Sequence, residues 1–178
     1  MKIYFYGAAQ TVTGSQHLIE ANGKKILLEC GIFQGHRRDF YERNSSFAFD
    51  PTELDAVILS HAHIDHSGNL PNLVKQGYRG PIYATPPTVD LAAIMLADSA
   101  HIYEEDVAFL NKKKRKHGEA MVEPLYTRYD AEKVESLFEP INYDQPFQPV
   151  EGVIARFVEA GHILGSSAIV LEVEESEE

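Results

Sequence analysis

The run from Ser60 to Gly68 limits what this chain can fold into more than any other part of the sequence. It reads Ser-His-Ala-His-Ile-Asp-His-Ser-Gly and directly follows a nearly continuous apolar segment that begins at Asp55. Short apolar segments of this kind are typical of strands buried on both faces of a sheet. Because His61 and His63 are two residues apart, their rings project to the same side if the backbone there is extended.

The ionisable side chains of this run predict a metal site. They are His61, His63, Asp65 and His66. Imidazole nitrogen and carboxylate oxygen are ligands that zinc accepts in hydrolytic sites. We expect a loop to turn Asp65 and His66 toward the same centre as the first two histidines. The alternative is a histidine-rich surface loop, but the run follows a buried strand, and α/β proteins bind their ligands at the carboxyl ends of such strands.

The rest of the chain alternates between strand and helix patterns. Asn22-Gly23 between two apolar runs predicts a hairpin, since both positions tolerate positive φ. Thr85 is placed to cap a long helix that runs from Pro86 to about Lys116. This order predicts the α/β class, with sheet layers covered by helices. Strands are expected at 2–6, 16–20, 24–28, 55–60, 81–84, 152–158 and 168–173, and further helices at 38–44, 68–76 and 130–138.

Length and charge narrow the class of protein. The chain has 178 residues, which suits one ordinary domain with a proper core. Its net charge is 16 − 27 = −11, which disfavours a protein that coats nucleic acid through a basic face. A nuclease is still compatible with this charge, because a metal site brings its own positive charge to a phosphate. We interpret the basic block 112–116 as the solvated end of a helix rather than an RNA-contacting patch.

Nothing in the sequence indicates a membrane or an exported protein. No apolar stretch approaches the ~20 residues that a membrane span needs, and the amino terminus lacks the pattern of a signal peptide. Cys30 is the single cysteine, so an internal disulfide is excluded, and we interpret it as a small core residue. We therefore expect a cytoplasmic protein without a membrane partner.

His-x-His-x-Asp-His after a hydrophobic strand is the signature of the metallo-β-lactamase superfamily. The chain resembles the β-CASP branch of that superfamily, which includes RNA-processing and DNA-repair nucleases. Within the branch it is similar to the bacterial and archaeal group that resembles the endonuclease subunit of the cleavage and polyadenylation specificity factor. The resemblance covers essentially the whole chain. The matching segments are the opening loop at 7–15, a first motif at 27–35, the helix at 88–106, and a third motif, Ala-Gly-His-Ile-Leu-Gly-Ser-Ser, at 160–167.

The resemblance implies a fold, a cofactor and a set of ligands. The fold would be the metallo-β-lactamase αββα sandwich, and residues 1–178 would be its N-terminal part. His61, His63 and His162 would hold one zinc ion, and Asp65 and His66 would begin the site of a second. Asp65 and His66 would also be the catalytic residues, with Asp65 positioning or deprotonating the water.

Two departures from the family pattern affect the assignment of these ligands and roles to this chain. Glu29 stands where the family usually has an aspartate that orients ligand histidines through hydrogen bonds, and the additional methylene predicts a looser geometry. The fourth metal motif, an aspartate expected beyond Val173, and the β-CASP insert with the general acid are absent from this sequence. The chain instead ends in acidic residues. An unfinished hairpin would leave a sheet edge exposed, so self-association into a homodimer is a risk.

The implied function is that of a zinc-dependent ribonuclease. It would cleave phosphodiester bonds of single-stranded or structured RNA with a water activated between two zinc ions. The metal run alone also fits a small-molecule metallohydrolase, such as a thioesterase or glyoxalase-like enzyme, but the opening loop and the helix at 88–106 favour the nuclease. A third hypothesis is that the isolated chain is an inactive metal-binding fragment. Asp98 and His101, one helical turn apart, are interpreted as an ordinary hydrogen-bonded pair.

Overall fold

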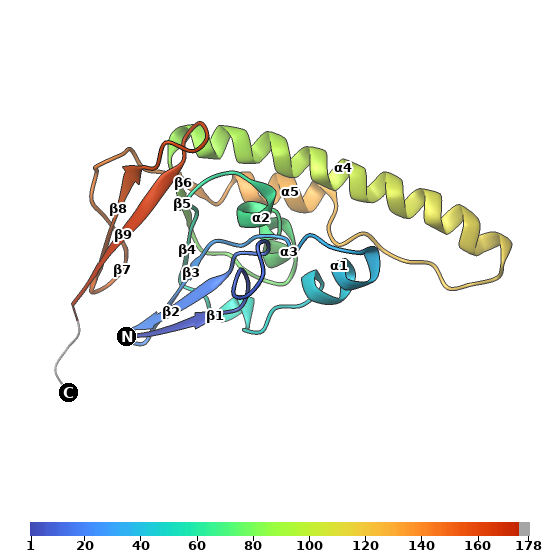
Figure 1. The fold of residues 1–178 in the computed structure, drawn as a ribbon, viewed down its shortest axis with the longest axis horizontal. Coiled ribbons are helices and arrows are strands. Elements are labelled where there is room, and N and C mark those ends of the chain that lie inside the picture. The colour runs from blue at the N-terminus through green and yellow to red at the C-terminus, as the bar shows by residue number, and fades with distance from the viewer. Residues whose placement is uncertain (175–178) are drawn as a thin grey trace.

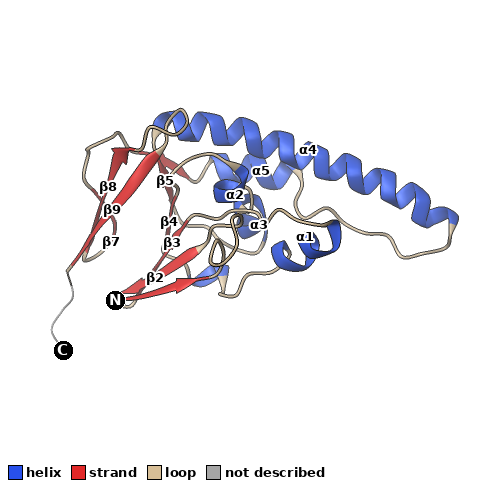
Figure 2. Cartoon of the chain, in the orientation of Figure 1, coloured by secondary structure: helices blue, strands red, loops and turns tan. Residues whose placement is uncertain are grey.

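The fold is a stack of three layers, one of helices and two of sheet (Figure 1). The computed structural model describes residues 1–174, apart from the side chains of Arg37 and Arg38. Most of the acidic carboxyl terminus noted in the sequence, at 175–178, lies outside the described residues. Figure 2 shows the helices gathered on one side of the larger sheet and the smaller sheet on the other.

The larger sheet has six strands in the order β1-β2-β3-β4-β5-β6. The strands are β1 (Lys2–Phe5), β2 (His17–Ala21), β3 (Lys24–Leu28), β4 (Ala56–Ile58), β5 (Ile82–Ala84) and β6 (Phe138–Pro140). β2 pairs antiparallel with both β1 and β3, whereas β3, β4, β5 and β6 pair in parallel. The predicted hairpin is confirmed, since Asn22 and Gly23 have φ of 52° and 73° between β2 and β3. The carboxyl end of the parallel β4 delivers the histidine run to one edge of the sheet.

The smaller sheet is antiparallel and packs face to face on the larger one. Its strands are β7 (Phe147–Val150), β8 (Val153–Glu159) and β9 (Ser167–Val173). Val153, Ala155 and Phe157 alternate along β8 and are buried in one cluster. The larger sheet contributes Ile19, Ala21, Ile26 and Ile58 to that cluster. The alternation expected of a half-buried strand therefore forms the contact between the two sheets.

The helices cover the opposite face of the larger sheet. They are α1 (Arg37–Asn44), η1 (Pro51–Glu53), α2 (Ile64–Ser67), α3 (Leu70–Lys75), α4 (Pro86–Lys116) and α5 (Arg128–Glu135). The main core lies between them and the sheet and includes Leu27, Val57, Leu73, Leu96 and Tyr126. Helix α4 has the predicted bounds and extends well past the sheet, so that its basic last turn lies at the far end of the molecule (Figure 1). Among the described helices, none is both long enough and apolar enough to cross a membrane.

Several local predictions were wrong. The helical turn α2 replaces the loop expected at Asp65 and His66. Thr85 stands at the start of α4 but does not cap it, because its hydroxyl donates to the carbonyl of Gly165 instead. The helix predicted at 130–138 ends at Glu135, and Phe138 pairs with Ile82 in a parallel strand too short to show a period in the sequence. β7 was not predicted.

The layer order agrees with the expected sandwich as far as the described residues go. Helices, the larger sheet and the smaller sheet form the first three layers of an αββα stack. Within residues 1–174 no helix covers the outer face of the smaller sheet, where Ile154 is 40% exposed.

Candidate metal centre

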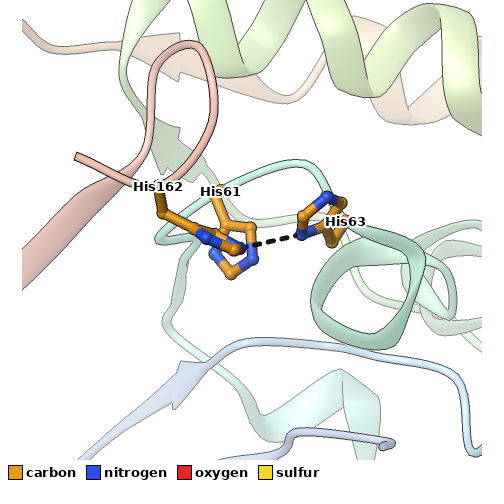
Figure 3. A group of neighbouring side chains, drawn as sticks. All are labelled: His61, His63 and His162. Atoms are coloured by element: carbon orange, nitrogen blue, oxygen red, sulfur yellow. Dashed lines mark hydrogen bonds between the residues drawn. The ribbon is translucent and has the colours of Figure 1, made fainter. Parts of the chain in front are cut away.

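Three histidines converge where the two sheets meet. His61 and His63 follow β4, and His162 comes from the loop between β8 and β9 (Figure 3). One ring nitrogen of each lies within 4.8 Å of the others. His162 Nε2 and His63 Nδ1 are 3.2 Å apart, although 99 positions separate them in the sequence. The structure thus brings together the three side chains that were predicted to share a zinc ion.

Backbone pairing between the two sheets fixes this convergence. The backbone N–H of Ser167, at the start of β9, donates to the carbonyl of Ser60 at 2.9 Å. The hydroxyl of Ser166 accepts hydrogen bonds from the backbone N–H groups of His162 and Ile163, at 3.0 and 3.1 Å. The loop that carries His162 is therefore tied to the strand end that carries His61.

The other end of that loop rests on the start of α4. The hydroxyls of Thr85 and Thr88 both donate to the carbonyl of Gly165, at 2.6 and 2.9 Å, and both side chains are fully buried. Gly165 has φ of 82°, and a Cβ there would lie 2.5 Å from the backbone nitrogen of Thr88. Only glycine fits this position without displacing the helix start. We did not predict this support, and the glycine in the third motif was its one sequence signal.

Glu29 connects His66 to the strand end. One carboxylate oxygen lies 3.0 Å from His66 Nδ1, and the other accepts the backbone N–H of Ser60 at 2.8 Å. Glu29 is buried and has φ of 62°, an uncommon conformation for a residue with a side chain. Because both oxygens are occupied, Glu29 is suited to orient His66 rather than to bind a metal, and His66 Nε2 is left for that purpose.

The histidines differ in their electrostatic surroundings. Burial and the neighbouring imidazoles lower the pKa of His61 to about 4. Burial alone would also lower the pKa of His66, but its hydrogen bond to Glu29 and the charges of Glu29 and Asp65 raise the pKa above its ordinary value. His61 is therefore neutral near pH 7, which is the state in which imidazole binds a metal.

Asp65 lies at the border of the cluster. Its Oδ2 is 3.7 Å from His66 Nε2, and its side chain is 27% exposed. Its backbone carbonyl accepts the N–H of Ser15, while the carbonyl of His66 accepts the N–H of Cys30. These bonds attach α2 to the segments that follow the opening loop and β3. His66, whose ring centroid lies 4.1 Å from that of His61, connects Asp65 to the histidine cluster.

The donor set fits zinc. Zn–N bonds of 2.0–2.1 Å in tetrahedral geometry place two imidazole nitrogens roughly 3.3 Å apart, and the nitrogens of His63 and His162 are 3.2 Å apart. His61 and His66 also offer ligand atoms within 4.8 Å of each other and of a Glu29 oxygen, and in that second group Glu29 holds His66 in place rather than binding metal. The assignments of individual ligands and catalytic residues stay predictions.

Other candidates have ordinary roles. His101 Nε2 lies 3.5 Å from the carboxylate of Glu105, one turn further along α4, rather than pairing with Asp98 as predicted. Cys30 is fully buried in the main core, and burial raises the pKa of its thiol. Of the basic block, Lys114 is paired with Glu119 at 3.0 Å just beyond the helix.

Comparison with known proteins agrees with this geometry. Residues 18–178 match the metallo-β-lactamase superfamily domain. The chain belongs to this superfamily. Solved structures show the same fold at low sequence identity: a metallo-β-lactamase from Cronobacter sakazakii superposes with a TM-score of 0.57 at 16% identity, covering 96% of this chain and 56% of the other.

The curated relatives that the chain matches are longer proteins. The chain is 38% identical over 174 residues to Ribonuclease TTHA0252 of Thermus thermophilus, covering 98% of this chain and 36% of the relative. It is 31% identical to the transcription termination factor FttA of Methanosarcina mazei, over 94% of this chain and 24% of the relative. It is 32% identical to Integrator complex subunit 11 of Danio rerio, over 97% and 28%. The chain thus spans about a third or less of these relatives.

Proposed function

We propose that this chain forms the principal metal-binding part of a zinc-dependent ribonuclease of the β-CASP branch. The single observation that carries the proposal is the convergence of His61, His63 and His162 from two sheets, with His66 beside them. Ribonuclease TTHA0252, a relative at 38% identity over nearly the whole chain, supports RNA as the substrate class.

The residues have distinct parts in this proposal. Zinc at such a centre supplies a Lewis acid that makes water nucleophilic near neutral pH. His61, His63 and His162 would provide imidazole nitrogens as ligands, and Glu29 would fix which nitrogen His66 presents. Asp65, whose carboxylate lies 3.7 Å from His66 Nε2, would accept a proton from the attacking water.

The reaction is hydrolysis of a phosphodiester. The oxygen of water forms a new bond to phosphorus while the bond from phosphorus to one ribose oxygen breaks. One proton of the water goes to the carboxylate of Asp65, and the departing ribose oxygen takes up a proton to become a hydroxyl. No oxidant or second substrate is needed. Products are one strand that ends in a phosphate and one that ends in a hydroxyl.

Metal analysis and RNA cleavage together test the proposal. We expect purified chain to contain zinc, and the His63→Ala variant to contain less and to cleave no single-stranded RNA, while its circular dichroism spectrum stays unchanged. His101→Ala, on the exposed part of α4, is the matched control and should behave like the wild type. Wild-type zinc content and cleavage in His63→Ala would contradict the proposal.

A further inference from the structure

A cavity that shares no lining residue with the histidine cluster lies at the opening loop. Its volume is about 340 Å³, within the range of small-ligand sites. Its lining residues come mainly from the end of β1, the opening loop at 7–14 and the end of α1 with the segment after it. Its lining includes Tyr6, Thr11, Thr13, Gln16, Phe33 and Arg43. Of the described residues that border this cavity, Arg43 alone carries a charge.

Arg43 is held in a defined place. Its guanidinium carbon lies 4.1 Å from the centroid of the Phe33 ring, a stacked cation–π contact. Phe33 is itself fixed by the buried side chain of Asn44, which accepts the N–H of Phe33 and donates to its carbonyl, both at 2.9 Å. The guanidinium therefore lies against a rigid wall, and among the described residues that line the cavity there is no carboxylate to neutralise it. In a chain of net charge −11, this arrangement favours an anionic ligand.

The opening loop, which forms another wall of the cavity, is attached to the segment that carries Phe33. The hydroxyl of Thr13 accepts the backbone N–H of Gln34 at 2.9 Å, which joins the opening loop to the segment of Phe33. A Cβ at Gly7 would lie 1.7 Å from the carbonyl oxygen of Gly14, so the two ends of the loop touch and the loop is closed on itself. The cavity is thus preformed in the structure.

The cavity adjoins the backbone that carries Asp65. Gly14, in its wall, precedes Ser15, whose N–H donates to the carbonyl of Asp65 at 2.9 Å. Phe33, in its other wall, follows Ile32, whose N–H donates to the carbonyl of Ile64 at 3.0 Å. Both walls are therefore one residue away from hydrogen bonds to α2. The backbone of the cavity walls is therefore continuous with the backbone that holds α2 and Asp65.

We propose that this cavity is a nucleotide subsite, which holds one nucleotide of the RNA whose backbone is bound at the metal centre. The inference rests on the proposed ribonuclease function. Arg43 donates to the phosphate of that nucleotide through its planar fork of N–H groups. The base stacks on the aromatic side chains of the lining, a sequence-tolerant contact typical of single-stranded RNA recognition.

Binding of a defined RNA to metal-free chain tests this subsite without cleavage. The probe is a fluorescein-labelled single-stranded RNA of eight adenosines, and its fluorescence anisotropy is measured against salt concentration. We expect Arg43→Ala to raise Kd about tenfold, since charge-assisted hydrogen bonds are the strong ones. The slope of log Kobs against log salt should also become shallower by about 0.7, the value for one phosphate contact on a single strand. Arg43→Lys keeps the charge but loses the planar fork of N–H groups, so its Kd should lie between the Kd of the wild type and that of Arg43→Ala.

Arg128→Ala is the matched control, because it removes one exposed cation from α5 that does not line the cavity. It should leave both Kd and slope unchanged. Equal Kd and slope for Arg43→Ala and Arg128→Ala would overturn the subsite, and the ribonuclease proposal would still stand if wild-type chain binds zinc and cleaves RNA. Wild-type chain that neither binds zinc nor cleaves RNA would instead refute the ribonuclease proposal, and the subsite with it.

Discussion

Replacing Gly31 by alanine should remove metal binding at the second position and leave it intact at the first. A Cβ at Gly31 would lie 1.6 Å from the carbonyl oxygen of Asp65, 2.2 Å from its carbonyl carbon and 2.8 Å from the backbone nitrogen of His66. Carbon and oxygen need roughly 3.3 Å even in a close contact, so the backbone of α2 must move by roughly 1.7 Å. These neighbours are backbone atoms, so no side-chain rotation can relieve the overlap.

The displacement has a cost in stability and a larger cost in metal binding. It breaks the hydrogen bonds from Ser15 to Asp65 and from Cys30 to His66, which are 2.9 and 2.7 Å long. At about 1 kcal/mol each plus local strain, we expect the free energy of unfolding to fall by about 2–4 kcal/mol. Metal sites tolerate only about 0.2 Å in their ligand distances, so Asp65 and His66 should no longer bind a metal together.

Zinc per chain, measured by mass spectrometry together with urea unfolding, checks this prediction. The variant should retain the zinc ion of the three histidines and lose any second one. Gly118→Ala is the control, because Gly118 has φ of 67° but nothing within 4 Å of a Cβ, so it carries only the cost of a strained backbone. Gly31→Ala with wild-type zinc content and stability within about 1 kcal/mol of Gly118→Ala would refute the reasoning.

Three further predictions concern the supports of the centre. Glu29→Gln removes the charge that holds His66 Nδ1, and titration with a competing chelator should show zinc affinity at the second position weakened by about 10–100-fold; unchanged affinity would show that the carboxylate has no orienting role. Thr88→Val removes one of the two hydroxyl hydrogen bonds to the buried carbonyl of Gly165. The free energy of unfolding, measured in urea, should fall by about 1–2 kcal/mol, and proteolysis near His162 should become faster. Stripping metal with a chelator should lower Tm, since a ligand that binds only the folded state stabilises it by mass action; an unchanged Tm would indicate that the histidines hold no metal.

Long and strongly patterned elements were predictable because their signals are local. Helix α4 has the predicted bounds, since Pro86 marks its first turn and apolar residues recur at helical spacing. The hairpin at Asn22 and Gly23 was predictable because few residues accept positive φ at both positions. Strand β6 was missed because its three residues are defined by their pairing with β5 and not by a pattern of their own.

The candidate site also contains residues that a local pattern predicts and residues whose place depends on distant contacts. His61, His63 and His66 could be singled out because they lie within one short run after a buried strand. His162, taken alone, is an ordinary loop histidine, and only the resemblance of its motif to the family made it a candidate. Its place depends on the pairing of Ser167 with Ser60, a contact between sheets that no local pattern encodes. The support from Thr85 and Thr88 was hidden for the same reason, since their spacing also suits an ordinary helix start.

The long separation between His63 and His162 also matters while the protein is being made. During synthesis the amino-terminal part of a chain emerges first. A nascent chain that has exposed β4 but not yet β8 and β9 presents two of the three histidines with no partner opposite them. The messenger RNA and the ribosome are therefore near an incomplete centre for as long as the smaller sheet is missing. The order of the elements therefore delays assembly of the proposed metal centre until both sheets have been synthesised and can pack together.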